Sequence, residues 1–108
     1  MKSKLKLSAK PKFKRVVSVP MPGEEAAVEV EFEFVGRGVR AYQQFLNDMA
    51  DGAFKDDAEL MQAFVCGWNL EDEFTDKNVG LLVDSYIGIV SLLLDVYSAE
   101  LWKARAGN

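Results

Sequence analysis

The sequence predicts an α+β fold in which an N-terminal antiparallel β-hairpin precedes a bundle of about four α-helices. The prediction rests on a change of period, because apolar residues alternate strictly in residues 28–34 and recur at helical spacing further along the chain. The length of 108 residues suits a single domain. We therefore expect a flexible basic leader in residues 1–11 and one α+β domain in residues 12–108, with the hairpin in 12–35 and the helices in 39–104.

The leader is the most basic part of the chain. Residues 1–23 contain seven basic and no acidic side chains, whereas the remainder carries a net charge of −11. The seven are Lys2, Lys4, Lys6, Lys10, Lys12, Lys14 and Arg15. Such a segment can contact nucleic acid or an acidic protein surface, or it can be a solvated terminus beside an acidic domain. The opposite charges predict that the leader and the domain attract each other.

Two stretches predict the hairpin. Residues 16–19 are rich in valine, and Pro20-Met-Pro-Gly23 has the composition of a turn. In residues 28–34, four apolar residues alternate with three glutamates, so one face is expected to be buried and the other to carry carboxylates. Lys12 and Lys14 share a parity that can place them on the glutamate face.

Two helices are predicted after the connector Gly36-Arg-Gly38. The first has one apolar stripe, which contains Val39, Tyr42, Phe45, Leu46 and Met49. Asp51-Gly52 is expected to stop it. The second begins at Asp56 or Asp57, either of which can cap free amide groups, and Gly67 closes it. This second helix is expected to bury Leu60, Met61, Phe64 and Val65.

Two more helices complete the predicted bundle. Thr75 is a good N-cap for the third, and residues 86–88 mark a break before the fourth. The fourth carries more apolar residues than a one-sided stripe: Ile89, Val90, Leu92, Leu93, Leu94, Val96, Tyr97, Leu101 and Trp102. Either several neighbours enclose this helix or part of it meets another chain. On this ground we expect self-association.

The composition argues against an enzyme and against a metal or cofactor site. The chain has no histidine, the side chain most often used near neutral pH as a general base and as a metal ligand. Cys66 therefore has no histidine to activate it, and we interpret it as a buried inert thiol at the end of an apolar helix. The acidic cluster Glu71, Asp72, Glu73 and Asp76 lacks the spacing of a calcium loop, so a solvated loop leading into a helix is favoured.

The same features predict a cytoplasmic protein. A single cysteine cannot form an internal disulfide, and the basic start is not followed by the apolar stretch of a signal peptide. The longest uncharged run in the most apolar region is Ser85–Leu94, which is too short to span a membrane.

Scattered positions over about residues 13–108 resemble the small tail assembly chaperones of long-tailed bacteriophages. They are Val17-Ser-Val19 with Val30-Glu-Phe32, Gly67-Trp68 with the acidic stretch to Phe74-Thr-Asp-Lys-Asn78, Leu81-Leu82 leading to Tyr86, and Tyr97 to Leu101 with Ala104-Arg-Ala-Gly-Asn108. Sequences of this type often have proline after the tyrosine, whereas this chain has Ile87. The lysine-rich leader lies outside the resemblance.

The resemblance implies a helper absent from the mature virion that binds the long, helical, aggregation-prone tape measure protein in the host cytoplasm. Some members are also made as a longer frameshifted product whose extension recruits tail tube protein. A tape measure presents apolar stripes, which fit helix-in-groove contacts with an apolar helper. The residues predicted to make the protein contacts are Trp68, Phe74, Leu93, Val96, Tyr97, Leu101 and Trp102.

A second hypothesis is a small regulatory or nucleic-acid-associated protein that uses the basic N-terminal segment for phosphate contacts. The acidic domain argues against it, because the glutamate-rich strand would repel a duplex. Salt separates the two hypotheses, since phosphate contacts weaken steeply as salt rises and apolar contacts do not.

Overall fold

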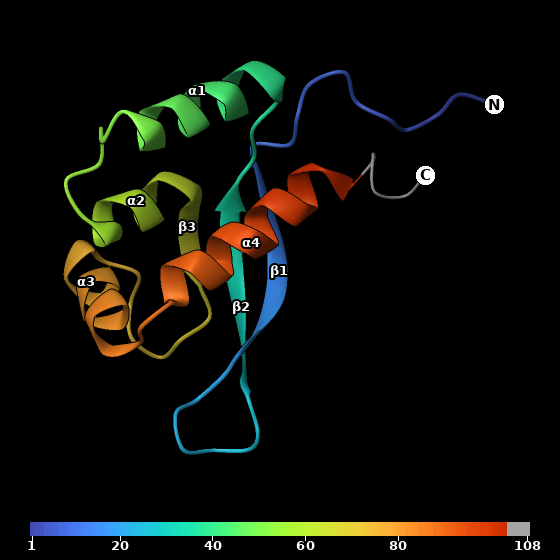
Figure 1. Cartoon of the computed structure of the whole chain (residues 1–108). Helices are drawn as coiled ribbons and strands as arrows, with labels where there is room; N and C mark the ends of the chain where they lie inside the picture. Colours follow the sequence, from blue (N-terminus) through green and yellow to red (C-terminus); the bar gives the residue numbers. More distant parts are fainter. Residues whose placement is uncertain (104–108) are drawn as a thin grey trace.

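A computed structural model describes residues 1–103 and confirms the α+β fold with a hairpin first. Figure 1 shows α4 crossing in front of β1 and β2, with the other three helices to one side. The elements are β1 (Lys12–Val19), β2 (Val28–Val35), α1 (Val39–Ala50), α2 (Asp57–Phe64), β3 (Val65–Trp68), α3 (Asp76–Ser85) and α4 (Ile89–Leu101). The predicted end of the helices at residue 104 lies outside the described residues.

The hairpin register places the lysines of β1 on the glutamate face of β2, as their parity allowed. Lys14 pairs with Glu33, and Ser18 pairs with Glu29, so the lysines and glutamates share the outer face of the sheet. Lys12 Nζ lies 3.9 Å from Glu33 Oε1, and the Ser18 hydroxyl donates a hydrogen bond to Glu29. Exposed pairs of this kind contribute little stability but favour this alignment over a shifted one.

The second helix is shorter than predicted, because Val65 and Gly67 belong to a strand. α2 ends at Phe64, and β3 pairs antiparallel with β2, which gives a sheet of order β1-β2-β3. Phe34 pairs with Val65 and Glu33 with Gly67. The third strand satisfies backbone groups along the edge of β2 that a two-stranded hairpin would leave unpaired. The predicted two-stranded hairpin is therefore corrected to a three-stranded sheet.

The predicted starts of the second and third helices and the break before the fourth are confirmed. Asp56 accepts a hydrogen bond from the Glu59 amide at 2.9 Å, and Thr75 Oγ1 accepts one from the Asn78 amide at 3.1 Å. Both are side-chain N-caps. Gly88 has a φ of 85°, a left-handed conformation that favours glycine and makes the break between α3 and α4.

The apolar stripe of α1 is only partly buried. Phe45 lies in the core and Tyr42 packs against it, whereas the Val39 side chain is 88% exposed. Val39 is the first residue of α1, ahead of the turns that reach the core. Its predicted place in the buried stripe is wrong.

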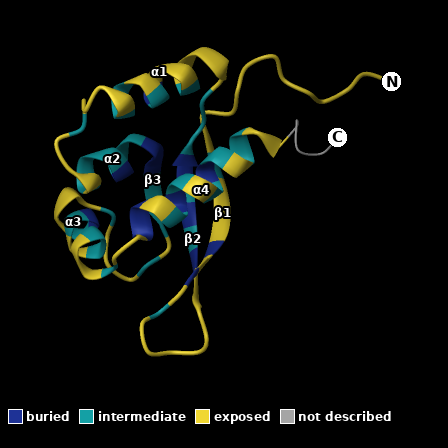
Figure 2. Cartoon of the chain, in the orientation of Figure 1, coloured by how far each residue is buried: buried dark blue, intermediate teal, exposed yellow. Residues whose placement is uncertain are grey.

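Neighbouring elements enclose most of α4. Its buried residues are Ile89, Val90, Leu93 and Tyr97, and the exposed ones are Ser91, Asp95 and Ala99. Figure 2 shows the buried part of α4 against the sheet. The large number of apolar residues in α4 had two possible explanations, enclosure by neighbouring elements or contact with another chain. For the core-facing residues, enclosure by the rest of this chain is the explanation.

No single helix among residues 1–103 is long and apolar enough to cross a membrane. α3 and α4 meet that criterion only when taken together, and the chain bends by 106° between them.

Tyr97 connects α4 to the end of the sheet. Its ring is fully buried, with aromatic centroids at 5.3 Å for Phe64 and 5.8 Å for Phe34. Its hydroxyl donates a hydrogen bond to the Val35 carbonyl at 2.7 Å and accepts one from Arg37 Nη1 at 3.0 Å. A buried hydroxyl is tolerated because both of these bonds are made.

The basic leader meets the domain at Gly36. The Gly36 amide donates a hydrogen bond to the Pro11 carbonyl at 2.9 Å. A Cβ on Gly36 would lie 1.6 Å from the Lys10 carbonyl oxygen, so only glycine allows this backbone approach. All residues before Lys12 are exposed.

We expect Tyr97→Phe to destabilise the fold by about 1–3 kcal/mol, because it removes the buried hydroxyl that donates to the Val35 carbonyl and accepts from Arg37. Tyr42→Phe is the matched control. The Tyr42 hydroxyl donates to Ser98 Oγ at 3.0 Å, but Tyr42 is only half-buried, so a smaller loss is expected. Urea denaturation measures both losses, and equal losses would contradict a special role for Tyr97.

The stability of the wild type should also fall more steeply above about pH 10 than that of Tyr97→Phe. Burial raises the pKa of Tyr97, although the hydrogen bond from Arg37 acts in the opposite direction. Because the folded pKa is the higher one, the unfolded chain loses its phenolic proton first as pH rises, and stability is lost above the unfolded pKa. The check is the difference in unfolding free energy between the two proteins from pH 8 to 11, and a constant difference would refute it.

Deleting residues 2–10 should leave the thermal midpoint nearly unchanged, because these side chains are exposed and Pro11, which bonds to Gly36, is retained. Calorimetry of the deleted and full chains tests the boundary. A fall of more than a few degrees would show that the leader packs on the domain.

Candidate functional site

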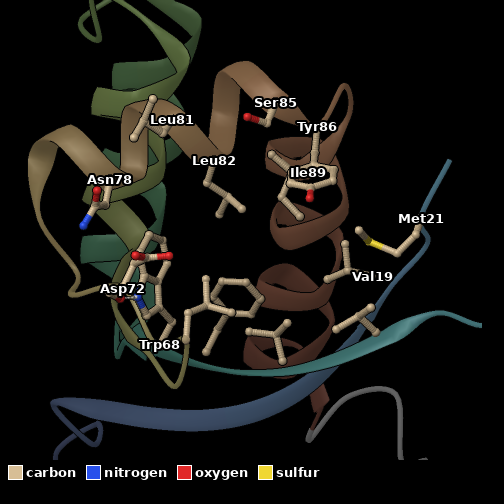
Figure 3. A pocket seen from close by; sticks show the side chains of 14 residues that line it. Val19, Met21, Trp68, Asp72, Asn78, Leu81, Leu82, Ser85, Tyr86 and Ile89 are labelled. Atoms are coloured by element: carbon tan, nitrogen blue, oxygen red, sulfur yellow. Dashed lines mark hydrogen bonds between the residues drawn. The ribbon is translucent and has the colours of Figure 1, made fainter.

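An open apolar groove of about 330 Å³ lies between the inner face of the sheet and α3. Figure 3 shows its lining side chains, which come from the hairpin, from the segment after β3 and from both helices next to the α3–α4 break. The residues of the sheet and hairpin are Val19, Met21, Val28, Val30, Phe32 and Trp68, and the others are Leu70, Asp72, Asn78, Leu81, Leu82, Ser85, Tyr86 and Ile89.

The floor of the groove is part of the protein core. Val30 and Phe32 point inward from β2, and both are almost fully buried. Ile89 closes the corner from the first turn of α4 and is 3% exposed. Because the floor is fixed by core packing, the groove is a preformed feature of the fold.

The rim is where apolar side chains reach the solvent. Val28 at the start of β2 is 46% exposed, and Leu81 on α3 is 55% exposed. A second hollow of about 180 Å³ continues round the α3–α4 turn, where the Ile87 side chain is fully exposed. Apolar surface gathered around a hollow is typical of a binding site, whereas single exposed residues are ordinary.

Trp68 forms one wall of the groove, and Phe74 packs against it. The two rings meet edge to face with centroids 4.9 Å apart. Trp68 Nε1 donates a hydrogen bond to the Asp72 carbonyl at 2.7 Å, which ties the segment after β3 into a tight loop. Asn69 adds a second tie, since its amide donates to the Glu31 carbonyl at 3.1 Å. The wall is thus held in place before any partner binds.

The groove is bordered by acidic segments. Residues 19–30 and 68–86, which supply most of its lining, contain eight acidic side chains and one basic side chain. Asp72 itself lines the groove, and Glu71 and Glu73 beside it are exposed. A partner with apolar side chains flanked by basic ones therefore fits this surface best.

The structure separates the seven predicted contact residues into three groups. Trp68 lines the groove, and Phe74 packs against the Trp68 ring without lining the groove itself. Leu93 and Tyr97 are 0% exposed and belong to the core, so the prediction of partner contact is corrected for these two. The remaining three are Val96 and Leu101, which are half-buried on α4, and Trp102, which is 50% exposed at its C-cap.

Sequence reasoning did not find Val28 and Leu81. Val28 has the parity of the buried strand residues, and its exposure depends on how far α3 stands from the sheet, which no local pattern encodes. For Leu81 a signal was available. The residues three and four positions away on its helix are all polar, so it lies on a polar face. They are Lys77, Asn78, Asp84 and Ser85.

Cys66 lies in β3 on the outer side of the sheet and not at the end of a helix. Its side chain is half-buried, and Sγ lies 3.8 Å from Glu33 Oε1. Burial raises the pKa of this thiol, and the neighbouring Glu33 carboxylate raises it further. A thiol whose pKa is raised is a weak nucleophile at neutral pH. Within residues 1–103, no group of three or more acidic or cysteine side chains is placed to hold a metal ion.

A protein-family model described as phage tail assembly chaperone matches residues 1–108, the whole chain. No curated protein and no solved structure matches the chain at a significant level. The match agrees with a domain that offers a preformed apolar groove for another protein. It implies a role in tail assembly through binding to tail proteins. The chain belongs to the phage tail assembly chaperone family.

Proposed function

We propose that this chain binds and solubilises the tape measure protein during tail morphogenesis, and that the groove receives apolar side chains of that client. One observation carries the proposal: Val28 and Leu81 stand exposed at the mouth of an apolar hollow whose floor is already packed. Exposing them to water is unfavourable in the free protein, so covering them favours a complex.

The size of the groove favours repeated weak contacts over one tight contact. A volume of about 330 Å³ takes a few aliphatic side chains, which is one or two turns of an amphipathic helix. A long helical client repeats such turns, so many copies of the chaperone can bind along it and add avidity. The acidic surface of each copy keeps the loaded client soluble.

The proposed action is binding without catalysis or a cofactor. We place it in the cytoplasm of the bacterial host, before the tail tube polymerises, and outside the mature virion. We also propose that tail tube protein is recruited through a longer frameshifted form. The raised pKa of Cys66 and its place on the far side of the sheet from the groove fit a thiol that takes no part.

Leu81→Glu should weaken client binding roughly tenfold or more, because a carboxylate at the mouth of the groove opposes burial of apolar side chains. Val39→Glu is the matched control: it is also a helical, exposed apolar residue changed to glutamate, but it lies away from the groove. The measurement is the soluble fraction of co-expressed tape measure protein, with affinity for a client fragment by calorimetry.

Trp102→Glu tests the other exposed residue of the predicted set. If Trp102→Glu abolished client solubility while Leu81→Glu left it intact, the client would bind at the C-terminal end of α4 and the groove proposal would fail. Equal effects of Leu81→Glu and Val39→Glu would also contradict it. Thermal midpoints of the three variants separate lost binding from lost folding.

A further inference from the structure

We infer that the basic leader of one molecule occupies the apolar groove of a second copy, so that the chain associates head to tail. The leader and the groove lie at opposite ends of the hairpin, as Figure 1 shows for the N-terminus and the hairpin loop. The self-association does not depend on the tape measure client.

Besides Met1, the leader carries two large apolar side chains that its own domain does not cover. Leu5 is 86% exposed and Leu7 is fully exposed. They alternate with Lys4 and Lys6, so in an extended chain both leucines lie on one side and the lysines on the other. This is the pattern of a peptide that docks apolar side chains and keeps its charges at the rim.

The groove matches this segment in volume and in charge. Its volume of about 330 Å³ is roughly eleven times that of a water molecule in the liquid, which is enough for the branched ends of two leucines. The segments that line the groove, residues 19–30 and 68–86, contain eight acidic side chains and one basic side chain. The first fifteen residues contain seven basic side chains and no acidic one. Lysines beside seated leucines would face Asp72 and its acidic neighbours.

The leader does not turn toward the groove of its own molecule. It leaves β1 at Pro11, whose carbonyl accepts the hydrogen bond from the Gly36 amide, and residues 1–11 are all exposed. Figure 1 shows the N-terminus on the opposite side of the molecule from the hairpin loop. α4 contacts β1 and lies between the leader and the end of the groove at Val19. In this arrangement the leader is presented to the groove of another copy.

Such a contact joins two different surfaces and does not close on itself, so each added copy offers a new leader and a new groove. If the groove also takes the client, as proposed above, then leader and client exclude each other. The chaperone would cover its own apolar groove until a client displaces the leader. The displacement of the leader by a client rests on the proposed function, whereas the head-to-tail self-association does not.

The test is sedimentation of the purified full chain and two variants without any client. Leu5→Ser/Leu7→Ser removes the leucines and keeps every charge, and Leu81→Glu blocks the groove. Each variant alone should be monomeric at concentrations where the wild type associates. Mixed in equal amounts, they should form a dimer and nothing larger, because only one intact leader and one intact groove remain. Val39→Glu should associate as the wild type does.

Three results would overturn the inference. The wild type could stay monomeric at millimolar concentration, the leader variant could associate like the wild type, or the mixture could stay monomeric. A leader that bound duplex DNA in a salt-sensitive manner, with no self-association, would assign it to nucleic acid instead. The leader substitutions lie in an exposed segment, so they leave folding intact and the outcome remains interpretable.

Discussion

The fold depends on satisfying one hydroxyl group inside an aromatic core. Tyr97 brings a polar atom into the place where α4, β2 and the connector after β2 meet, and Val35 and Arg37 supply its partners. Arg37 is itself held above the Phe45 ring at 4.6 Å, so α1 joins the same arrangement. Because a buried hydroxyl without partners is costly, the position of α4 along the sheet is fixed by this group. A purely apolar contact would allow α4 to shift along the sheet, whereas the hydrogen bonds of Tyr97 are made in only one position of the helix.

Local rules predicted the parts of the fold that depend on neighbouring residues. The caps at Asp56 and Thr75, the break at Gly88 and the alternating faces of the hairpin follow from spacing and side-chain chemistry. The third strand did not, because Val65 continues a helical pattern and its pairing with Phe34 is a contact between distant segments. For the candidate site, Trp68 was found as an aromatic residue, but burial of Leu93 and exposure of Val28 follow from tertiary packing.

The tightly packed aromatic core and the solvent-exposed groove lie in different parts of the molecule. The aromatic core and the Tyr97 hydrogen bonds lie where the leader enters, and the groove lies towards the hairpin loop and the α3–α4 turn. α4 runs between the two and contributes Tyr97 near one end and Ile89 at the other. The helix with too many apolar residues for a surface is thus packed inside the domain, and apart from Trp102 at its C-cap the most exposed apolar side chains belong to other elements.

The sheet order also places β1 at a free edge, where unpaired backbone groups could recruit another extended chain. Lys12, Lys14 and Arg15 stand along this edge, and Arg15 lies 3.4 Å from Glu100 on α4. Positive charges on an edge strand oppose the approach of a second strand of the same kind. A tail assembly chaperone with a free edge strand is itself exposed to cross-β pairing, and these basic residues oppose the growth of its sheet into an aggregate.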